Sequence, residues 1–293
     1  MQLHPYGNSG LEVSALGFGA GHIGSSQMSE DEAGTLLNRA LDLGITLIDT
    51  ARGYGLSEER IGRHLSWRRG DFVLSSKGGY GVEGVPDWSA ECILRGVEQA
   101  LERLQTDHLD IFHLHSCPQE TLERAELWDA LEEVKNRGQV RTVAYSGENA
   151  DLAYALENTP VGGVQTSVNL FDQRSLSDNL PLAQQKGIGV IAKRPVANAP
   201  WRFLERPVGD YAEVYWERML AMQLEFGGVD PLEYSLRFSA FAPGVSSAIL
   251  GTGSLEHLEK AVQAVEKGPL ALEEVALIRA RFEALGADWE GQV

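Results

Sequence analysis

Short runs of apolar, often β-branched residues alternate with longer amphipathic segments along the whole chain. The short runs are apolar at successive positions, which is typical of parallel strands that are covered by helices on both faces. The predicted strands span residues 15–19, 45–49, 72–77, 109–115, 140–146, 163–168, 189–193 and 247–251. The predicted helices span residues 29–43, 57–65, 89–104, 121–135, 151–157, 175–185, 232–241 and 255–265.

Eight strand–helix units in a chain of 293 residues predict a closed barrel. We therefore expect an α/β protein, a (β/α)8 or TIM barrel, formed by residues 1–293 as a single domain. Serine and glycine residues at the helix ends support these boundaries. The predicted N-caps are Ser29, in a capping box with Glu32, and Ser57, Ser89 and Ser175, and the predicted terminating glycines are Gly44, Gly138 and Gly187.

Three segments lie outside the eight units. Residues 3–6 and 11–14 flank a glycine-rich turn and predict an N-terminal β-hairpin that caps the barrel floor. An extra C-terminal helix is predicted at residues 272–285. The connection over residues 194–230 contains a further predicted helix at 211–226, and its length is typical of a functional insertion.

Four polar residues fall at or just after the ends of consecutive predicted strands. Asp49, Lys77 and His115 each end a strand, and Tyr54 follows Asp49 in the next loop. In a parallel barrel the carboxyl ends of all strands lie on the catalytic face. Because neighbouring strands are about 4.8 Å apart, we expect these side chains to converge within roughly 10 Å.

The four residue types suit proton donation to an oxygen that gains negative charge, as in hydride addition to a carbonyl. A phenol is a poor acid at neutral pH, but a neighbouring ammonium such as that of Lys77 favours its ionised form. A buried Lys77 requires a counter-charge, which Asp49 can supply. His115 can orient the substrate oxygen towards the hydroxyl of Tyr54, the predicted general acid.

Each of the four residues also has a structural interpretation. Asp49 could cap a helix or lie on the rim, and Tyr54 could be a turn residue. Lys77 could pair with a rim carboxylate, and His115 could be a hydrogen-bonded core histidine. Structural roles do not predict that all four follow successive strands, so their joint placement favours catalysis.

The segment Gly19-Ala20-Gly21-His22-Ile23-Gly24 matches the glycine pattern of dinucleotide-binding folds. In those folds a helix opens within the pattern and its amides hold the pyrophosphate. Here four residues intervene before the cap at Ser29, and Asp49 lies too far along the chain. The barrel therefore remains the favoured interpretation. In it, Gly21 belongs to a stretch of backbone without side chains, which a planar ring can approach.

Charge and composition narrow the classes of partner. The formal net charge of −17 argues against binding of nucleic acid or anionic lipid. The chain contains no run of about 20 apolar residues, so no membrane span is predicted. Two cysteines and the lack of a basic, then apolar, leader predict a cytoplasmic protein. A local basic island at residues 193–206 could still attract a phosphate-bearing ligand.

Three segments together resemble the aldo-keto reductase family, and the likeness covers nearly the whole chain. Residues 48–59 resemble its DTA-x-x-YG…SEE segment, residues 74–77 its catalytic-lysine strand, and residues 101–115 its L-x-x-L-x-x-D-x-x-D-x-x-x-x-H stretch. The resemblance implies NAD(P)H-dependent reduction of a small-molecule aldehyde or ketone. It assigns the roles described above to Asp49, Tyr54, Lys77 and His115.

The resemblance also implies cofactor contacts. Ser146 and Gln165 match the residues that hold the nicotinamide carboxamide, and Asn169 lies at a position near them. Gly147 replaces a usual asparagine, and Lys193-Arg194-Pro195 stands where many members have an aromatic residue that stacks on the nicotinamide. The remaining expected contacts are Lys193 and Arg194 for the pyrophosphate and Gly251, Thr252 and His257 near the adenosine.

The cofactor itself and two other functions stay open. Many members carry lysine and arginine around the 2′-phosphate in the segment of Gly251 to His257, and both are missing here. The resemblance favours NADPH, and NADH is not excluded. One alternative function is a barrel that binds the cofactor as a sensor or scaffold without turnover. Another is a metal-dependent hydrolase that uses His113 and His115, which would need further ligands.

Overall fold

The structure is a computed structural model that describes all residues from 1 to 293. Eight parallel strands close into a barrel in the order β10-β3-β4-β5-β6-β7-β8-β9, which confirms the predicted (β/α)8 fold. The strands are β3 (Leu16–Gly19), β4 (Leu47–Asp49), β5 (Val73–Gly78), β6 (Leu109–His115), β7 (Val140–Ser146), β8 (Gly163–Ser167), β9 (Gly189–Lys193) and β10 (Ser247–Gly251).

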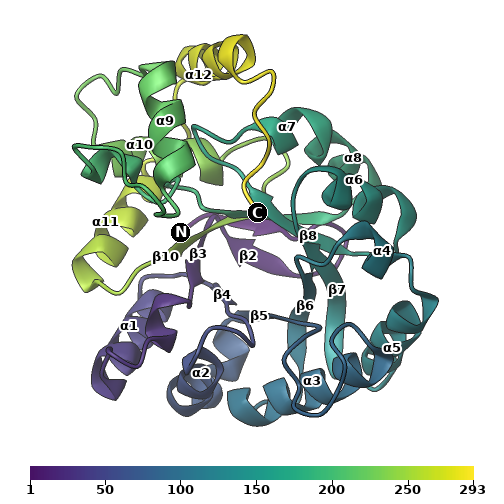
Figure 1. Ribbon diagram of the computed structural model, residues 1–293. Coiled ribbons are helices and arrows are strands. Elements are labelled where there is room, and N and C mark those ends of the chain that lie inside the picture. Colours follow the sequence, from purple (N-terminus) through teal and green to yellow (C-terminus); the bar gives the residue numbers. More distant parts are fainter.

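Helices surround the barrel, which Figure 1 shows along its axis. They are α1 (Glu30–Asp42), α2 (Ser57–Leu65), α3 (Ala90–Leu104), α4 (Gln119–Leu122), α5 (Ala125–Asn136), α6 (Asn149–Asn158), α7 (Arg174–Asp178), α8 (Leu180–Lys186), α9 (Glu213–Met222), α10 (Pro231–Ala240), α11 (Leu255–Glu266) and α12 (Leu272–Leu285). None of them combines the length and the apolar composition needed to cross a membrane.

The predicted helix starts are mostly confirmed, but two capping roles are wrong. Ser29 forms a capping box with Glu32, and the Ser89 hydroxyl accepts a hydrogen bond from a backbone amide in the first turn of α3. Ser57 lies inside the first turn of α2, and its hydroxyl donates to the Ala20 carbonyl instead. Ser175 is likewise inside α7 and bonds with a strand side chain. Both hydroxyls join helices to the barrel.

Two predicted helices are each divided in two. The segment predicted as one helix over residues 121–135 forms α4 and α5, because the Trp128 side chain takes the Leu122 carbonyl that a continuous helix would use (2.7 Å). The segment predicted at residues 175–185 forms α7 and α8. Pro181, in the first turn of α8, lacks the amide that would bond back into α7.

The barrel floor is closed by the predicted hairpin of β1 (Leu3–Pro5) and β2 (Glu12–Ser14). Tyr6, in its turn, is fully buried with Leu47, Ile111 and other apolar residues inside the barrel. A Cβ atom at Gly163 would lie 1.9 Å from the Tyr6 hydroxyl. The bare backbone there gives the phenol ring its space, and the ring fills the lower barrel.

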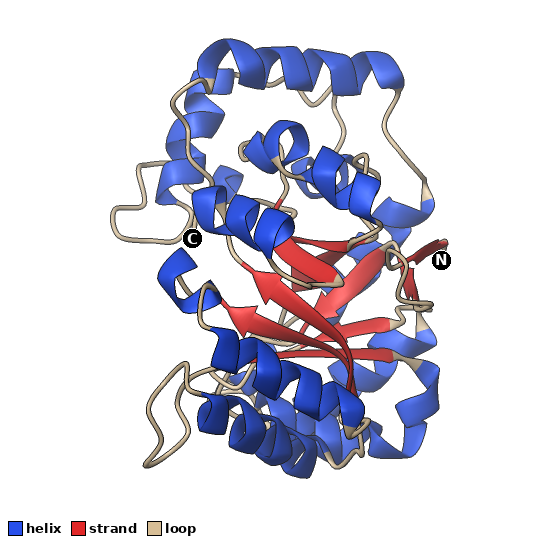
Figure 2. Cartoon of the chain, turned by 90° about the vertical axis from the view of Figure 1, so that its right-hand side faces the viewer, coloured by secondary structure: helices blue, strands red, loops and turns tan.

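The two ends of the chain lie at opposite ends of the barrel (Figure 2). The N-terminal hairpin lies at the floor. The C-terminus lies on the side towards which the strand arrows point, which we call the barrel mouth. The final residues, 286–293, leave α12 and reach this mouth, where the predicted catalytic side chains also lie.

Candidate active site

The structure brings the four predicted catalytic residues together at the barrel mouth. Asp49, Lys77 and His115 lie at or near the ends of the adjacent strands β4, β5 and β6. Tyr54 follows β4 in the loop to α2. Its ring meets the His115 ring edge to face, with 6.1 Å between the centroids, and the Lys77 Nζ atom lies 5.1 Å from the Tyr54 ring centre.

A buried ion pair anchors the group. Lys77 Nζ donates to Asp49 Oδ2 (2.5 Å) and to the Thr50 carbonyl (2.9 Å). The other carboxylate oxygen of Asp49 accepts hydrogen bonds from Ser75 Oγ (2.8 Å) and Gln165 Nε2 (3.0 Å). Burial alone would lower the pKa of Lys77, but the Asp49 charge and the Tyr54 side chain outweigh it and raise that pKa. The lysine is therefore a permanent ammonium beside the phenol.

The loop that carries Tyr54 is fixed by close backbone packing. A Cβ atom at Gly24 would lie 1.7 Å from the Tyr54 carbonyl oxygen. The Leu56 amide donates to the Gly24 carbonyl (3.0 Å), and Ser57 bonds the same loop to the barrel. Gly24, the final glycine of the pattern that resembles a dinucleotide-binding motif, therefore allows two loops to pack closely together. The segment forms a short 3-10 helix, His22–Gly24, well before α1 begins.

His115 is neutral at physiological pH. Burial, followed by the charges of Lys77 and Lys193, lowers the pKa of His115 to about 3. Its Nδ1 atom lies 2.8 Å from the hydroxyl of Tyr80, a residue that the sequence interpretation missed. Tyr80 follows β5 in a loop rich in glycine. An aromatic residue between glycines just after a strand, as at Tyr54, was the signal that could have identified it.

His113 lies deeper in the barrel than His115. It is fully buried, and its Nε2 atom is 3.1 Å from Ser75 Oγ. Burial and the Lys77 charge hold the pKa of His113 well below its ordinary value. Nowhere in the chain do three or more His, Cys, Asp or Glu side chains gather in a way that could hold a metal ion. The geometry thus gives no support to the hydrolase alternative.

A crevice of about 950 Å³ opens at the barrel mouth beside the four residues. Asp49 and Tyr54 line it, and it extends past β10 to the start of α11. Five of the predicted cofactor residues line the crevice: Gly21, Arg194, Gly251, Thr252 and His257. Trp201, His22, Arg202 and Lys260 also line it. Four glycines are among its lining residues and contribute no side chains to it: Gly19, Gly21, Gly251 and Gly253.

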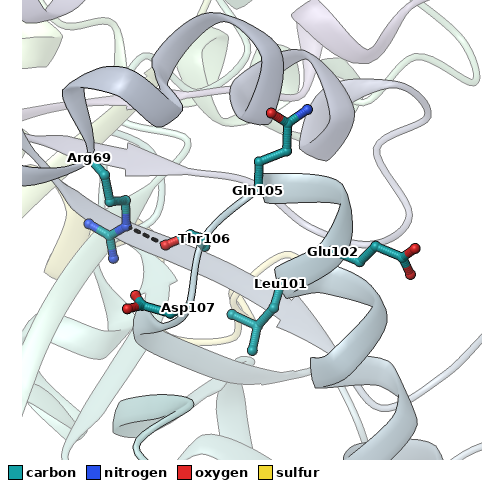
Figure 3. A pocket seen from close by; sticks show the side chains of 6 residues that line it. All are labelled: Arg69, Leu101, Glu102, Gln105, Thr106 and Asp107. Carbon is teal, nitrogen blue, oxygen red and sulfur yellow. Dashed lines mark hydrogen bonds between the residues drawn. The ribbon is translucent and has the colours of Figure 1, made fainter.

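A second hollow, of about 690 Å³, lies outside the C-terminal end of α3 (Figure 3). Its lining includes Arg69, Gln105 and Thr106, and Arg69 Nε donates to Thr106 Oγ1 (3.0 Å). These residues precede β6 and therefore lie towards the floor. No predicted site residue is near this hollow, so the mouth crevice is the candidate active site.

Ser146, Gln165 and Asn169 are buried at the ends of β7 and β8. Gln165 bonds Asp49, and Ser146 Oγ lies 3.5 Å from Gln165 Oε1. Asn169 is fully buried and its Nδ2 atom has no hydrogen-bond partner. A buried amide donor without a partner fits a ligand carbonyl such as that of a carboxamide. At Gly147, a Cβ atom would lie 2.4 Å from the Tyr145 hydroxyl, so an asparagine has no room there.

The basic residues of the segment 193–206 are largely neutralised. The segment was expected to form a basic island, but carboxylates from elsewhere in the chain pair with three of its four basic residues. These pairs are Lys193–Glu148 (3.2 Å), Arg202–Asp210 (3.7 Å), and Arg206 with Glu213 and Glu217 (2.7 Å each). These carboxylates lie outside the segment, so a count of the charges within it does not include them.

The C-terminal tail, residues 286–293, packs onto the β8–β9 side of the mouth. The Gly291 backbone and the Asn149 side chain exchange two hydrogen bonds (2.8 and 3.0 Å). The Gln292 amide donates to Asp172 Oδ2 (3.0 Å), and the Gln292 carbonyl accepts from Arg194. Arg194 has no carboxylate partner. Its guanidinium bonds the tail, and its side chain also lines the crevice.

The tail contact includes a titratable group. Burial, followed by the nearby Glu148 charge, raises the pKa of Asp172 from 3.8 to about 6. An ionised Asp172 therefore opposes folding. The resulting loss in free energy of unfolding is absent below about pH 4, grows as the pH rises, and is complete above about pH 6.

We expect Asp172→Asn to gain stability relative to the wild type as the pH rises from 4 to 6.5. The asparagine cannot ionise, and the difference in free energy of unfolding should change by up to about 3 kcal/mol over this window. Urea unfolding at several pH values measures it. Asp178→Asn, an exposed neighbour on α7, is the control and should give a flat difference. A flat difference for Asp172→Asn as well would contradict the assignment.

Comparison with known proteins agrees with the fold. Residues 15–282 match the model of the Aldo/keto reductase family. The chain is 31% identical to L-galactose dehydrogenase from Arabidopsis thaliana, over 90% of this chain and 88% of that protein. It is 29% identical to the uncharacterized oxidoreductase YqkF from Bacillus subtilis, over 95% and 96%. The holo form of aldo-keto reductase AKR11C1 from Bacillus halodurans matches with a TM-score of 0.85, 29% identity and 96% coverage of both chains.

Proposed function

Because this chain belongs to the aldo-keto reductase family of oxidoreductases, we propose that it reduces the carbonyl group of a small aldehyde or ketone with a nicotinamide cofactor. The single observation that supports this most strongly is the buried Lys77–Asp49 pair beside Tyr54 and the neutral His115. Both cysteines are free, in agreement with the cytoplasmic location that we propose.

The proposed chemistry assigns one task to each residue. A nicotinamide cofactor held in the crevice would supply the hydride that is added to the carbonyl carbon. Tyr54 gives its hydroxyl proton to the substrate oxygen as negative charge develops there. The Lys77 ammonium stabilises the phenolate that remains, and Asp49 keeps that ammonium charged and in place. His115 donates a hydrogen bond to the same substrate oxygen and orients it.

The residues around the crevice fit a nicotinamide cofactor. We propose that Asn169 Nδ2, which has no partner, and Ser146 bind the carboxamide, and that Gln165 turns from Asp49 to do the same. Arg194 and Lys193 lie where the pyrophosphate is expected, although Lys193 is paired with Glu148. Gly21 and Gly251 leave room along the crevice, and Thr252 and His257 line its end at α11.

A turnover assay tests the proposed function. Purified protein is mixed with NADPH or NADH and a panel of aldehydes, ketones and quinones, and the loss of absorbance is followed. The panel also includes aldoses with the oxidised cofactors, because one similar protein is named L-galactose dehydrogenase. Oxidation of a reduced cofactor by a carbonyl is the expected result. Tight cofactor binding without turnover on any compound would instead favour the sensor or scaffold function.

We propose NADPH as the preferred cofactor. The usual lysine and arginine are missing from the segment of Gly251 to His257, but two cations from other positions line the same end of the crevice. Lys260 is one turn beyond His257 on α11, and Arg202 comes from the connection after β9. Lys260 and Arg202 hold only exposed pairs, with Glu256 and Asp210, which a phosphate can replace at little cost.

We expect Lys260→Met to weaken NADPH binding roughly threefold to tenfold and to leave NADH binding nearly unchanged. Only NADPH carries the 2′-phosphate that the ammonium attracts. Titration of cofactor fluorescence gives both dissociation constants. Lys267→Met removes an ammonium beyond the other end of α11, where it pairs with Glu233, and should change neither constant. Equal weakening of NADPH and NADH by Lys260→Met would rule out the phosphate contact.

A further inference from the structure

Tyr80 contacts His115 at Nδ1, the ring nitrogen that has no task in the proposed reaction. It lies in the loop after β5, and its hydroxyl is 2.8 Å from His115 Nδ1. The two rings are 5.7 Å apart at an angle of 35°. Tyr54 meets the same histidine ring edge to face. His115 is therefore held between two tyrosines, of which only Tyr54 has a role in the chemistry described above.

The position of Tyr80 is fixed by its surroundings. Trp88 packs on its ring with 5.9 Å between centroids. The Trp88 backbone amide donates to the Gly79 carbonyl (2.7 Å), and this hydrogen bond joins the two ends of the loop. A Cβ atom at Gly53 would lie 2.7 Å from the Tyr80 hydroxyl. The hydroxyl can reach the histidine only because residue 53, in the Tyr54 loop, has no side chain.

The direction of the hydrogen bond follows from the chemistry of its two partners, because a phenol hydroxyl is a good donor and an unprotonated imidazole nitrogen is a good acceptor. His115 Nδ1 is the only hydrogen-bond partner that the protein gives the Tyr80 hydroxyl. Burial, the largest cause, raises the pKa of Tyr80, so the phenol keeps its proton. Because the protein offers this proton no other acceptor, the Tyr80 hydroxyl donates to Nδ1 of His115. A neutral imidazole has a single N–H, so its proton must then be on Nε2.

We propose that Tyr80 is a positioning residue that holds neutral His115 in the tautomer with the proton on Nε2. The proposal rests on the proposed carbonyl reduction, in which Nε2–H is the donor to the substrate oxygen. In the other tautomer, Nε2 carries a lone pair and repels that oxygen. Tyr80 thus acts on the reaction through His115 and does not contact the substrate itself.

Nitrogen NMR of protein labelled in the imidazole rings tests the proposal, because protonated and unprotonated ring nitrogens have well-separated shifts. The His115 signals are identified by their loss in His115→Gln. We expect the wild type to show a protonated Nε2 and an unprotonated Nδ1. In Tyr80→Phe the ring stays and the hydroxyl is removed, and we expect a mixture of both tautomers. A wild-type spectrum with the proton on Nδ1 overturns the proposal without any variant.

Kinetics and a matched control complete the experiment. With an active carbonyl, Tyr80→Phe should lower kcat/KM roughly tenfold and leave the Kd of NADPH unchanged. Tyr145→Phe also removes a buried phenol hydroxyl, one that donates to the Cys117 carbonyl, and should leave the His115 spectrum unchanged. An unchanged spectrum in Tyr80→Phe overturns the inference. The proposed function fails separately, if the wild type reduces no carbonyl while its spectrum is as expected.

Discussion

Replacing Tyr54 with phenylalanine is expected to lower kcat by about 10²- to 10⁴-fold, because the reaction loses its general acid. The ring remains and can still pack against His115 and Lys77. Cofactor binding should therefore change little. Steady-state kinetics with an active carbonyl and titration of cofactor fluorescence measure the two effects separately.

Two further variants make this result specific to Tyr54. Tyr154→Phe removes a phenol hydroxyl on α6, a helix that contributes no residue to the crevice lining, and should retain wild-type kcat. His115→Gln keeps a hydrogen-bond donor, and its loss of activity should be smaller than that of Tyr54→Phe. If Tyr54→Phe turned over substrate at the wild-type rate, another group would have to be the proton donor.

Lys77→Met is expected to cost about 3–5 kcal/mol of unfolding free energy and to abolish measurable turnover. The substitution leaves the Asp49 carboxylate, which is 1% exposed, without its counter-charge inside the barrel. Two hydrogen bonds from the protein, donated by Ser75 and Gln165, then remain to the carboxylate. Urea unfolding gives the free energy, and cofactor oxidation gives the activity.

The double variant Asp49→Asn with Lys77→Met separates stability from catalysis. Without the carboxylate no unpaired charge is buried, so most of the lost stability should return. Turnover should stay absent, because no ammonium remains beside the phenol. A double variant that is no more stable than Lys77→Met alone would show that the two groups are not coupled.

The sequence predicted the barrel well because its strands are buried on both faces, so each appears as an uninterrupted apolar run with glycine or a cap nearby. Gly44, Gly138 and Gly187 all adopt the positive φ angle expected at helix ends. The errors came from side-chain hydrogen bonds that the hydrophobic pattern does not contain. The Trp128 side chain interrupts one helix, and the Ser57 hydroxyl serves the barrel in place of its helix.

The site could be predicted in part for the same reason. The ends of adjacent parallel strands must be neighbours, so Asp49, Lys77 and His115 follow from their places in the strands. Tyr80 could not be found in this way, because its contact depends on the path of a loop. The partner of Lys193 was also hidden, since Glu148 reaches it from a different strand–helix connection.

The route of the final residues has a practical consequence for handling the protein. Gln292 is bonded between Asp172 and Arg194, and Arg194 also lines the crevice. An affinity tag or a fused reporter at this end would begin within the reach of an incoming ligand. At the other end, the chain starts beside the hairpin that seals the floor, so a purification handle there leaves the approach to the crevice free.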